Sequence, residues 1–297
     1  MSTATALSRK KTSTADLVII GAMIVISALC MFPLLHNLAV SFSSQGPANA
    51  GLVTVWPVQP TLSSYLEIIK DEKFFQALWV SIERVFFVTV LAFLLTVHIA
   101  FPLSRDAKQF PLRSVFVWLL VFVMMFNGGL IPFYLAMKKL HLTNSFWGLV
   151  IPLVINVFNV ILVINFFRNI PKELDESASI DGAGPWKVLY AVYLPLSVPV
   201  LATITLFNIV NTWNEYFLGL IMVQNQAQIP LQTYIQQIIV QIDPTRIASG
   251  DTAYLANISN KTLNAAKIMV TMIPIMLVYP FLQRYFINGI MLGSVKE

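Results

Sequence analysis

Six long apolar windows constrain this chain more than any other feature of its sequence. Each comes close to the roughly 20 residues that a helix needs to cross a hydrocarbon core. The windows are 17–40, 85–103, 115–137, 146–167, 198–223 and 268–286. They are continuous rather than alternating, and backbone groups in lipid must pair within their own segment, so helices are expected and a barrel is not. The sequence therefore predicts an all-α integral membrane protein with six transmembrane helices.

The composition also favours a membrane protein. Of the 297 residues, 57% are hydrophobic and only 11% are charged, and the mean hydropathy is +0.74. A soluble domain needs far more charge to cover its surface. The net charge is +5, but the basic residues lie at helix ends and form no patch interleaved with aromatic residues. Orientation in the membrane explains them, and no nucleic acid is expected as a partner.

Basic residues in two short segments predict the orientation. The segment Arg9 to Lys11 precedes the first window, and the loop from Arg105 to Arg113 follows the second. Short loops rich in lysine and arginine stay on the cytoplasmic side, and six spans place both termini on one side. The tails 1–16 and 289–297 and the segment around Asp181 are therefore expected in the cytoplasm. The first window is too long for a signal peptide, so we interpret it as an uncleaved helix.

Motifs for catalysis or nucleotide binding are missing from the sequence. It contains no GxxxxGK[ST] loop, HExxH, GxSxG or GxGxxG, and its three histidines have no carboxylates at the spacing of metal ligands. The single cysteine, Cys30, permits no disulfide within the chain. The chain is therefore predicted to be non-catalytic and to bind no metal or cofactor itself. Energy for uphill transport must then come from another polypeptide.

A polar, acidic segment separates the fourth and fifth windows. Asn169 is expected to cap a helix that begins at Pro171, with acidic residues in its first turns, where a helix N-terminus favours negative charge. Gly182 is expected to end this helix. Pro185 then starts a second helical stretch that ends near Pro195. Residues 169–197, hereafter the elbow, are thus predicted to form a helix-turn-helix that projects into the cytoplasm.

The elbow resembles the cytoplasmic loop of the permease subunits of binding-protein-dependent ABC importers. That loop carries the pattern EAA, three residues, G, nine residues, then I-x-LP. The matching residues here are Glu176, Ser177, Ala178, Gly182, Val192, Leu194 and Pro195. Asp181-Gly182-Ala183 is the DGA form common in sugar importers. Ser177 in place of alanine and Val192 in place of isoleucine depart from the pattern but keep its spacing.

Other segments resemble the carbohydrate branch of this family, the maltose-permease-like subunits. These are Trp213-Asn214-Glu215 and the ending from Gly289 to Lys296. The segments Asn127 to Pro132 and Tyr279 to Tyr285 are similar to subunits for complex oligosaccharides and polysaccharides. That group includes the second permease subunit of alginate importers.

The resemblance implies the type I ABC importer permease fold over residues 17–288, in a bacterial inner membrane. It implies an importer for an oligosaccharide or polysaccharide, with a related permease as heterodimer partner, two cytoplasmic ATPase subunits that bind ATP and Mg²⁺, and an external solute-binding protein. The elbow is then a coupling helix, and Ala178 is small enough to let the ATPase approach closely. The residues implied at this contact are Glu176, Ser177, Ala178, Asp181, Gly182, Ala183, Leu194 and Pro195.

Polar residues within the windows are the candidates for a substrate path. They are Asn127, Asn211, Trp213, Asn214 and Glu215. Amides and aromatic faces suit sugars, and an unpaired amide or carboxylate is costly in a membrane. The same groups also serve to tie helices together, and both roles stay open for each of them. For His98, a bond to the carbonyl of a neighbouring helix is the simpler expectation.

Alternative functions are disfavoured but stay open. An importer for another solute conflicts with the Trp-Asn-Glu segment and the C-terminal pattern. An ion-coupled secondary transporter would need charged pairs within spans and an internal repeat, which are not evident in the sequence. A membrane-embedded sugar transferase would need an acidic pair or metal cluster.

Separately, the sequence of residues 229–242 predicts an amphipathic helix that either contacts an external partner or shields helix ends.

Overall fold

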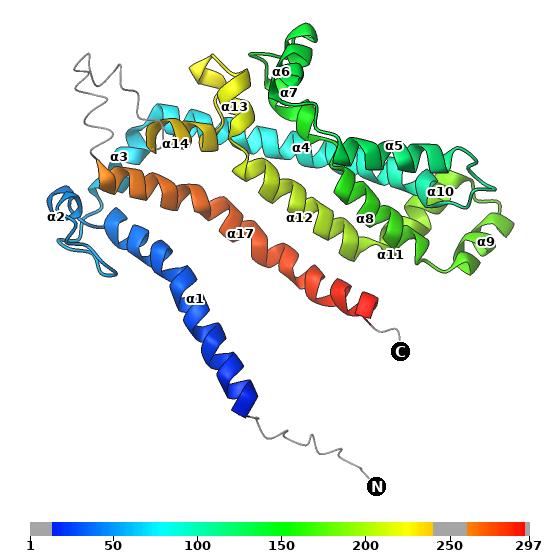
Figure 1. Ribbon diagram of the computed structural model, residues 1–297, viewed down its shortest axis with the longest axis horizontal. Coiled ribbons are helices and arrows are strands. Elements are labelled where there is room, and N and C mark those ends of the chain that lie inside the picture. Colours follow the sequence, from blue (N-terminus) through cyan, green and yellow to red (C-terminus); the bar gives the residue numbers. More distant parts are fainter. Residues whose placement is uncertain (1–13, 240–259, 295–297) are drawn as a thin grey trace. The chain divides into compact units, whose positions relative to one another are not determined.

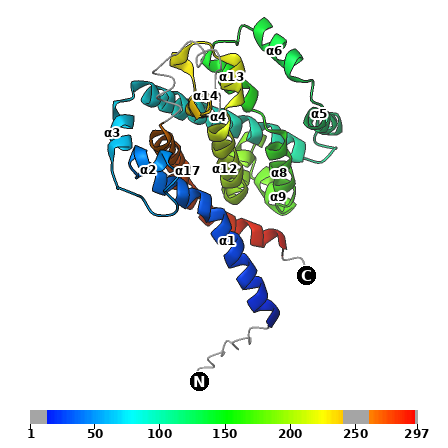
Figure 2. The same ribbon diagram turned by 60° about the vertical axis from the view of Figure 1, so that its left-hand side comes forward.

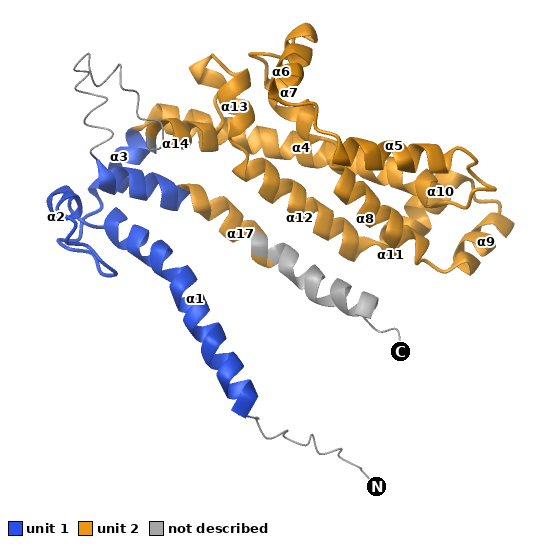
Figure 3. Cartoon of the chain, in the orientation of Figure 1, with its two compact units in different colours: residues 1–70, 243–270 blue, residues 71–242, 271–297 orange. Residues whose placement is uncertain are grey.

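The computed structural model describes residues 14–239 and 260–294, and helices are the regular elements of this part of the chain (Figure 1). The described residues form two compact units, one from 14–70 with 260–270 and one from 71–239 with 271–294 (Figure 3). The first unit contains α1 (Thr14–Ser41), α2 (Gln45–Asn49), α3 (Ser63–Lys70) and the start of α17 (Lys261–Ser294). Within it, the Asn37 amide donates to the carbonyl oxygen of Ala265 over 3.3 Å.

The second unit is built on α4 (Glu72–Ser104), along which α8 and α12 pack, as two views show (Figures 1 and 2). Its other helices are α5 (Arg113–Met125), α6 (Leu130–Lys139), α7 (Phe146–Val150), α8 (Val157–Arg168), α9 (Lys172–Ile180), α10 (Pro185–Val188), α11 (Leu194–Leu196), α12 (Val198–Asn214), α13 (Phe217–Met222) and α14 (Leu231–Ile239). Short 3-10 turns lie at Ile151–Leu153 and Gln226–Gln228, and a π turn lies at Leu189–Tyr193.

Two larger groups of buried apolar side chains hold the second unit together, beside a small one formed by Val88, Val150 and Val154. The first core cluster joins the C-terminal half of α4 to α8, the π turn and the N-terminal half of α12, with members such as Val97, Phe167 and Ile204. The second core cluster joins α6, α7 and α13, with members such as Leu149 and Met222. In α4, Val97 is followed three and four positions later by Ala100 and Phe101, the spacing that gives a helix one apolar face.

The lengths and compositions of the helices fit a membrane protein. Three helical stretches are long and apolar enough to cross a bilayer alone: α1, α4 and the 261–278 part of α17. Three further windows lie in bent pairs of helices, α5 with α6 at 116°, α7 and its 3-10 turn with α8 at 41°, and the elbow helices with α12 at 82°. The described part of the chain thus holds up to six spans if each bent pair counts as one.

The continuity predicted for three windows is wrong. The window 115–137 breaks after α5, where the Asn127 side chain accepts the N–H of Gly129 over 2.9 Å. The window 146–167 breaks before α8, where the Asn156 side chain accepts the N–H of Asn159 over 3.3 Å. The window 198–223 breaks at Glu215, which has extended backbone angles. In the first two windows, short amide side chains compete for backbone groups and interrupt the helical ladder.

Two predicted boundaries also differ from the structure. Helix α4 begins at Glu72, well before the window 85–103. The window began only after Arg84, so it left out a helical stretch that contains charged residues. Helix α17 continues to Ser294, so most of the predicted tail 289–297 is helical and the rest lies outside the described residues.

The predicted helix in 229–242 is confirmed over α14, and residues 240–242 lie outside the described part. The N–H of Leu231 donates to the Ser81 hydroxyl over 2.7 Å. The Tyr234 hydroxyl donates to Asp71 over 2.8 Å, and burial together with this carboxylate raises the pKa of Tyr234. Helix α14 therefore packs on α4. Its contact with an external partner and its shielding role both stay predictions.

Candidate functional site

The elbow contains a short helix with a well-formed C-terminus. Helix α9 ends at Ile180, and Gly182 follows with a φ of +74°, a left-handed conformation that costs glycine little. The N–H of Gly182 donates to the carbonyl of Ser179 over 3.1 Å, and that of Ala183 donates to the carbonyl of Ala178 over 2.9 Å. This pair of bonds is a Schellman motif, which satisfies carbonyls left open at a helix end. The predicted helix stop at Gly182 is confirmed.

The predicted start of this helix is wrong by one residue, and its cap is different. Pro171 precedes α9, and no side chain caps the helix. Asn169 instead lies just after the last residue of α8. Two residues separate it from α9, so its side chain is not placed to receive the first N–H groups of that helix. Acidic residues Glu173 and Asp175 do lie in the first turn, as the helix dipole favours.

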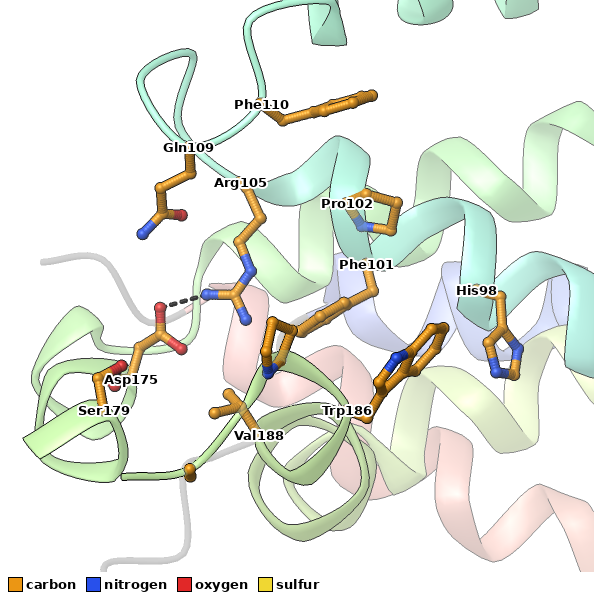
Figure 4. Close-up of a pocket in the computed structure, with 12 residues that line it drawn as sticks. His98, Phe101, Pro102, Arg105, Gln109, Phe110, Asp175, Ser179, Trp186 and Val188 are labelled. Atoms are coloured by element: carbon orange, nitrogen blue, oxygen red, sulfur yellow. Dashed lines mark hydrogen bonds and ion pairs between the residues drawn. The ribbon is translucent and has the colours of Figure 1, made fainter. Parts of the chain in front are cut away.

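One face of α9 is fastened to the end of α4. Asp175 forms an ion pair with Arg105, the residue directly after α4 (Figure 4). The Arg105 guanidinium also stacks on two rings, 4.2 Å from the centre of Phe101 and 4.7 Å from that of Tyr193. The Arg105 and Asp175 side chains are 13% and 18% exposed, so little solvent screens the pair. Arg105 thus links α4, α9 and the π turn through one planar cation.

A second ion pair lies at the exposed start of α9. The Lys172 ammonium donates to Asp106 over 2.7 Å, and both side chains are well exposed. This contact lowers the pKa of Asp106 and raises the pKa of Lys172. In addition, Arg168 at the end of α8 donates to the carbonyl of Leu103 over 3.2 Å. Three cationic side chains therefore connect the elbow and α8 to the end of α4 and the residues that follow it.

The opposite face of α9 is open. Leu174 and Ile180 are exposed, Ile180 at 86% of its surface, and Ser177 lies between them on the same face. Ala178 and Ala183 instead pack against the first core cluster. The small side chain of Ala178 therefore lets α9 approach the chain's own core, and the exposed apolar groups are Leu174 and Ile180. Glu176, Asp181 and Gly182 are also exposed.

The second arm of the elbow changes helix type twice. Helix α10 passes into the π turn, which passes into α11. Leu189 and Tyr193 of the π turn are buried, and Leu194 packs against the first core cluster, whereas Pro195 is exposed. The widened turn brings Tyr193 against Phe101 and Phe167, with ring centres 5.2 and 5.3 Å apart. This arm is anchored in the core, so α9 is held at both ends.

A cavity of about 560 Å³ lies between α4, the loop after it and the elbow (Figure 4). Phe101, Trp186 and Phe110 give it apolar walls, and Arg105 and His98 add polar groups. His98 contacts the Tyr190 hydroxyl over 2.9 Å and the carbonyl of Leu94, in its own helix, over 2.6 Å. His98 thus bonds to a neighbouring helical segment through a hydroxyl, and the expected bond to a carbonyl of another helix is wrong, because the carbonyl belongs to α4 itself.

The structure separates the candidates for the substrate path. Asn211 and Asn214 are exposed on α12, and the Asn214 amide donates to the carbonyl of Val210 over 2.9 Å. Trp213 is buried, and its indole N–H donates to the carbonyl of Thr271 over 3.2 Å. Trp213 therefore ties helices together, whereas Asn211 and Asn214 are exposed on one side of α12.

Asn127 and Glu215 lie apart from that open face. Asn127 is exposed at the break between α5 and α6, where it shapes the turn. Glu215 lies directly after α12 and forms an ion pair with Arg84 of α4. Elsewhere in this unit, the buried amides of Asn159 and Asn208 bond to each other over 2.9 Å and join α8 to α12.

Arg84 is a residue that the sequence reasoning missed. It directly precedes the window 85–103, yet it lies inside α4 and is only 1% exposed. A charged pair therefore joins Glu215, which falls within the window 198–223, to Arg84 of α4, although no such pair within spans is evident in the sequence. A helical period through Phe74, Ala77, Ser81, Arg84 and Val88 would have indicated that Arg84 faces inward.

Comparisons with known proteins identify the family of this chain. Residues 113–291 match the family model described as "Binding-protein-dependent transport system inner membrane component". The chain belongs to this family. The matched region contains the whole elbow, both exposed amides of α12 and Glu215. The fold is accordingly that of a type I permease, an all-α membrane protein.

Similar proteins cover nearly the whole chain. The polygalacturonan/rhamnogalacturonan transport system permease protein YtcP of Bacillus subtilis is 35% identical over 95% of this chain and 98% of its own length. The protein LplC of Bacillus subtilis is 35% identical over 91% of both chains. Among solved structures, a chain from a bacterial ABC transporter involved in the import of the acidic polysaccharide alginate is 32% identical. It has a TM-score of 0.82 and covers 92% of this chain and 98% of its own.

Proposed function

We propose that this chain is the permease subunit of an ATP-driven importer for an acidic oligosaccharide or polysaccharide, and that the elbow couples it to the ATPase. The observation that carries the coupling role is the geometry of α9. The helix is capped by Gly182, fastened to α4 by Arg105 and Asp175, and open on the face that holds Ile180. A helix held in this way moves as a rigid body with α4, so a push on its open face reaches the spans.

The contact surface of the elbow follows from its exposure. Leu174 and Ile180 supply the apolar area, and Glu176 and Asp181 supply acidic groups beside it. Ser177, Gly182 and Pro195 complete the exposed residues of the implied contact, whereas Ala178, Ala183 and Leu194 support it from the core side. We propose that this surface docks on one of two ATPase subunits that bind ATP and Mg²⁺, with both termini on the same cytoplasmic side.

The proposed substrate is a uronate polymer. Two of the similar proteins are named for such substrates, one for polygalacturonan and rhamnogalacturonan and the other for the acidic polysaccharide alginate. Lys138 and Lys139 are exposed at the end of α6, on the side that we propose is external, where they would attract an anionic chain. Asn211 and Asn214 then offer uncharged hydrogen-bonding groups along the path. The external binding protein and the related permease that completes the path belong to this proposal.

The test is transport by the complete importer in proteoliposomes. This chain would be reconstituted with its partner permease, ATPase subunits and binding protein, and uptake measured for an alginate pentasaccharide, an oligogalacturonate and a neutral malto-oligosaccharide. Uptake of an acidic sugar that requires ATP supports the proposal. Uptake of the neutral sugar alone would refute the acidic substrate, and ATP-independent uptake driven by an ion gradient would refute the coupling role.

The coupling role has its own variant. Gly182→Asp places a side chain in the left-handed conformation and adds charge to the open face, while Gly184→Asp adds the same charge two residues later at ordinary backbone angles. We expect Gly182→Asp to lose sugar-stimulated ATP hydrolysis in an assembled complex and Gly184→Asp to retain more of it. Full stimulation in Gly182→Asp would contradict the assignment of the elbow.

A further inference from the structure

Arg84 is a buried cation whose hydrogen bonds reach the ends of two other helices, α7 and α12. Its Nε donates to the carbonyl of Leu149 over 3.2 Å, and one terminal nitrogen donates to the carbonyl of Glu215 over 3.1 Å. The other terminal nitrogen forms the ion pair with the Glu215 carboxylate. Leu149 lies in the last turn of the short helix α7, where carbonyls lack partners within the helix. Arg84 thus supplies donors to two interrupted helices at once.

Glu215 completes the arrangement on the other side of the break. Its extended backbone ends α12, and its second carboxylate oxygen accepts the N–H of Leu218, in the first turn of α13, over 2.7 Å. Glu215 is therefore bonded to Arg84 through both its carbonyl and its carboxylate while it caps the next helix. The Glu215 side chain keeps 20% of its surface exposed, whereas that of Arg84 keeps 1%.

The break lies between the two core clusters. The N-terminal half of α12 belongs to the first cluster, and α13 belongs to the second. Helix α13 is also fixed to α14, because Gly219 allows so close an approach that an added Cβ would lie 2.0 Å from the Thr233 hydroxyl. Along the connection from α12 to α13, a movement of one cluster relative to the other is absorbed where the helical ladder is interrupted, which is at Glu215. Such irregular backbone is tolerated within a membrane only where it is buried in protein or lines a cavity.

The residues before the break have opposite surroundings. Trp213 is buried against α17, and Asn214 is exposed as the last residue of α12. Because successive helical residues point about 100° apart, any slip of the break would turn the Asn214 amide away from its open face. The position of Glu215 therefore sets the direction of Asn214.

We propose that Arg84 and Glu215 form a positioning pair that sets the geometry of the break after α12 and holds the Asn214 amide on the transport path. The pair touches no substrate. It keeps α7, α12 and α13 in register while the two core clusters move relative to each other. The proposal rests on the family membership and on the ATP-driven cycle proposed above.

The test follows the environment of residue 214 in the reconstituted complex of both permeases, the ATPase subunits and the binding protein. Cys30, the single cysteine, is replaced by serine, and Asn214→Cys is labelled with a membrane-impermeant methanethiosulfonate reagent. Labelling rates are compared without nucleotide and after trapping with ATP and vanadate. In this background the labelling rate should change between the two states, because a displacement of the break moves residue 214 relative to its open face.

Two variants separate positioning from stability. Arg84→Met leaves Glu215 unpaired and is expected to weaken assembly, whereas Arg84→Met with Glu215→Leu removes both charges and is expected to assemble and melt like the parent. In this double variant the difference between the two labelling rates should disappear. Glu83→Gln is the matched control, because Glu83 is the preceding residue of α4 and its contact, with Trp79, is exposed.

The outcomes are distinguishable. Retention of the full difference in the double variant would overturn the positioning role. Equal labelling rates in both states when Arg84 and Glu215 are unchanged and ATP hydrolysis is normal would also overturn the positioning role. That result would leave the proposed function intact. Failure of any ATPase to assemble with the chain would overturn the proposed function and the inference together.

Discussion

The C-terminal cap of α9 gives a sharp prediction because two glycines of the elbow form a matched pair. A Cβ built on Gly182 or on Gly184 meets no atom within 4 Å, so neither alanine variant has a steric clash with a neighbour. The two positions differ in backbone conformation, with φ at +74° for Gly182 and −71° for Gly184. A side chain in the left-handed region costs about 1–2 kcal/mol. Gly182→Ala should therefore destabilise the cap by that amount.

The expected magnitude can be read from hydrogen exchange. The amides of Gly182 and Ala183 donate the two bonds of the Schellman motif. A loss of about 1–2 kcal/mol raises the population of the open form, and with it the exchange rate, by about 5- to 30-fold. Gly184→Ala should leave exchange unchanged or slow it slightly, because alanine restricts the unfolded chain without straining this conformation.

The assay is hydrogen exchange with mass spectrometry on the assembled complex, following a peptide that covers both glycines. Equal protection of Gly182→Ala and the parent would refute the argument, because it would mean that the cap does not limit local opening. A similar loss of protection in Gly184→Ala would refute it as well, because the effect would then not depend on the sign of φ.

Three further predictions concern the contacts of α9. Removing either partner of the Arg105–Asp175 pair should lower the stability of the solubilised protein by about 1–3 kcal/mol. This is less than for a fully buried pair, because both side chains keep some contact with solvent. Thermal unfolding of the two single variants and the double variant measures the coupling between the two residues. The Lys172–Asp106 pair makes stability depend on pH at both ends of the scale. Because the pKa of Asp106 is lowered, its contribution is present above the ordinary value of 3.8 and is lost as the pH falls through the lowered pKa. Because the pKa of Lys172 is raised, its contribution is present below the ordinary value of 10.5 and is lost as the pH rises through the raised pKa. Lys172→Met should thus remove part of the acid-side decline in a melting-temperature series, and an unchanged series would contradict the contact. Ile180→Ser should change the free energy of unfolding by no more than about 0.5 kcal/mol, since the side chain is exposed. It should nevertheless reduce sugar-stimulated ATP hydrolysis. A normal rate of hydrolysis would exclude Ile180 from the docking surface.

The parts of the elbow that were predicted correctly depend on local backbone chemistry. The stop at Gly182 and the second helix from Pro185 follow from which conformations glycine and proline adopt, and these hold in the structure. The cap at Asn169 failed for a local reason too. Asn169 is the C-terminal cap residue of α8, and the sequence contains no signal that separates the end of α8 from the start of α9 at that point.

The sequence by itself determined that this chain is an α-helical membrane protein with six long apolar windows and a capped polar elbow, because composition, apolar run length and turn residues act over a few neighbouring positions. The tertiary structure alone decided that Ala178 faces inward while Ile180 faces outward, and that the fifth window breaks at Glu215. It also decided that Arg84 meets a carboxylate far along the chain. These features depend on which helices pack together, since a buried charge is stable only where a distant segment supplies its partner.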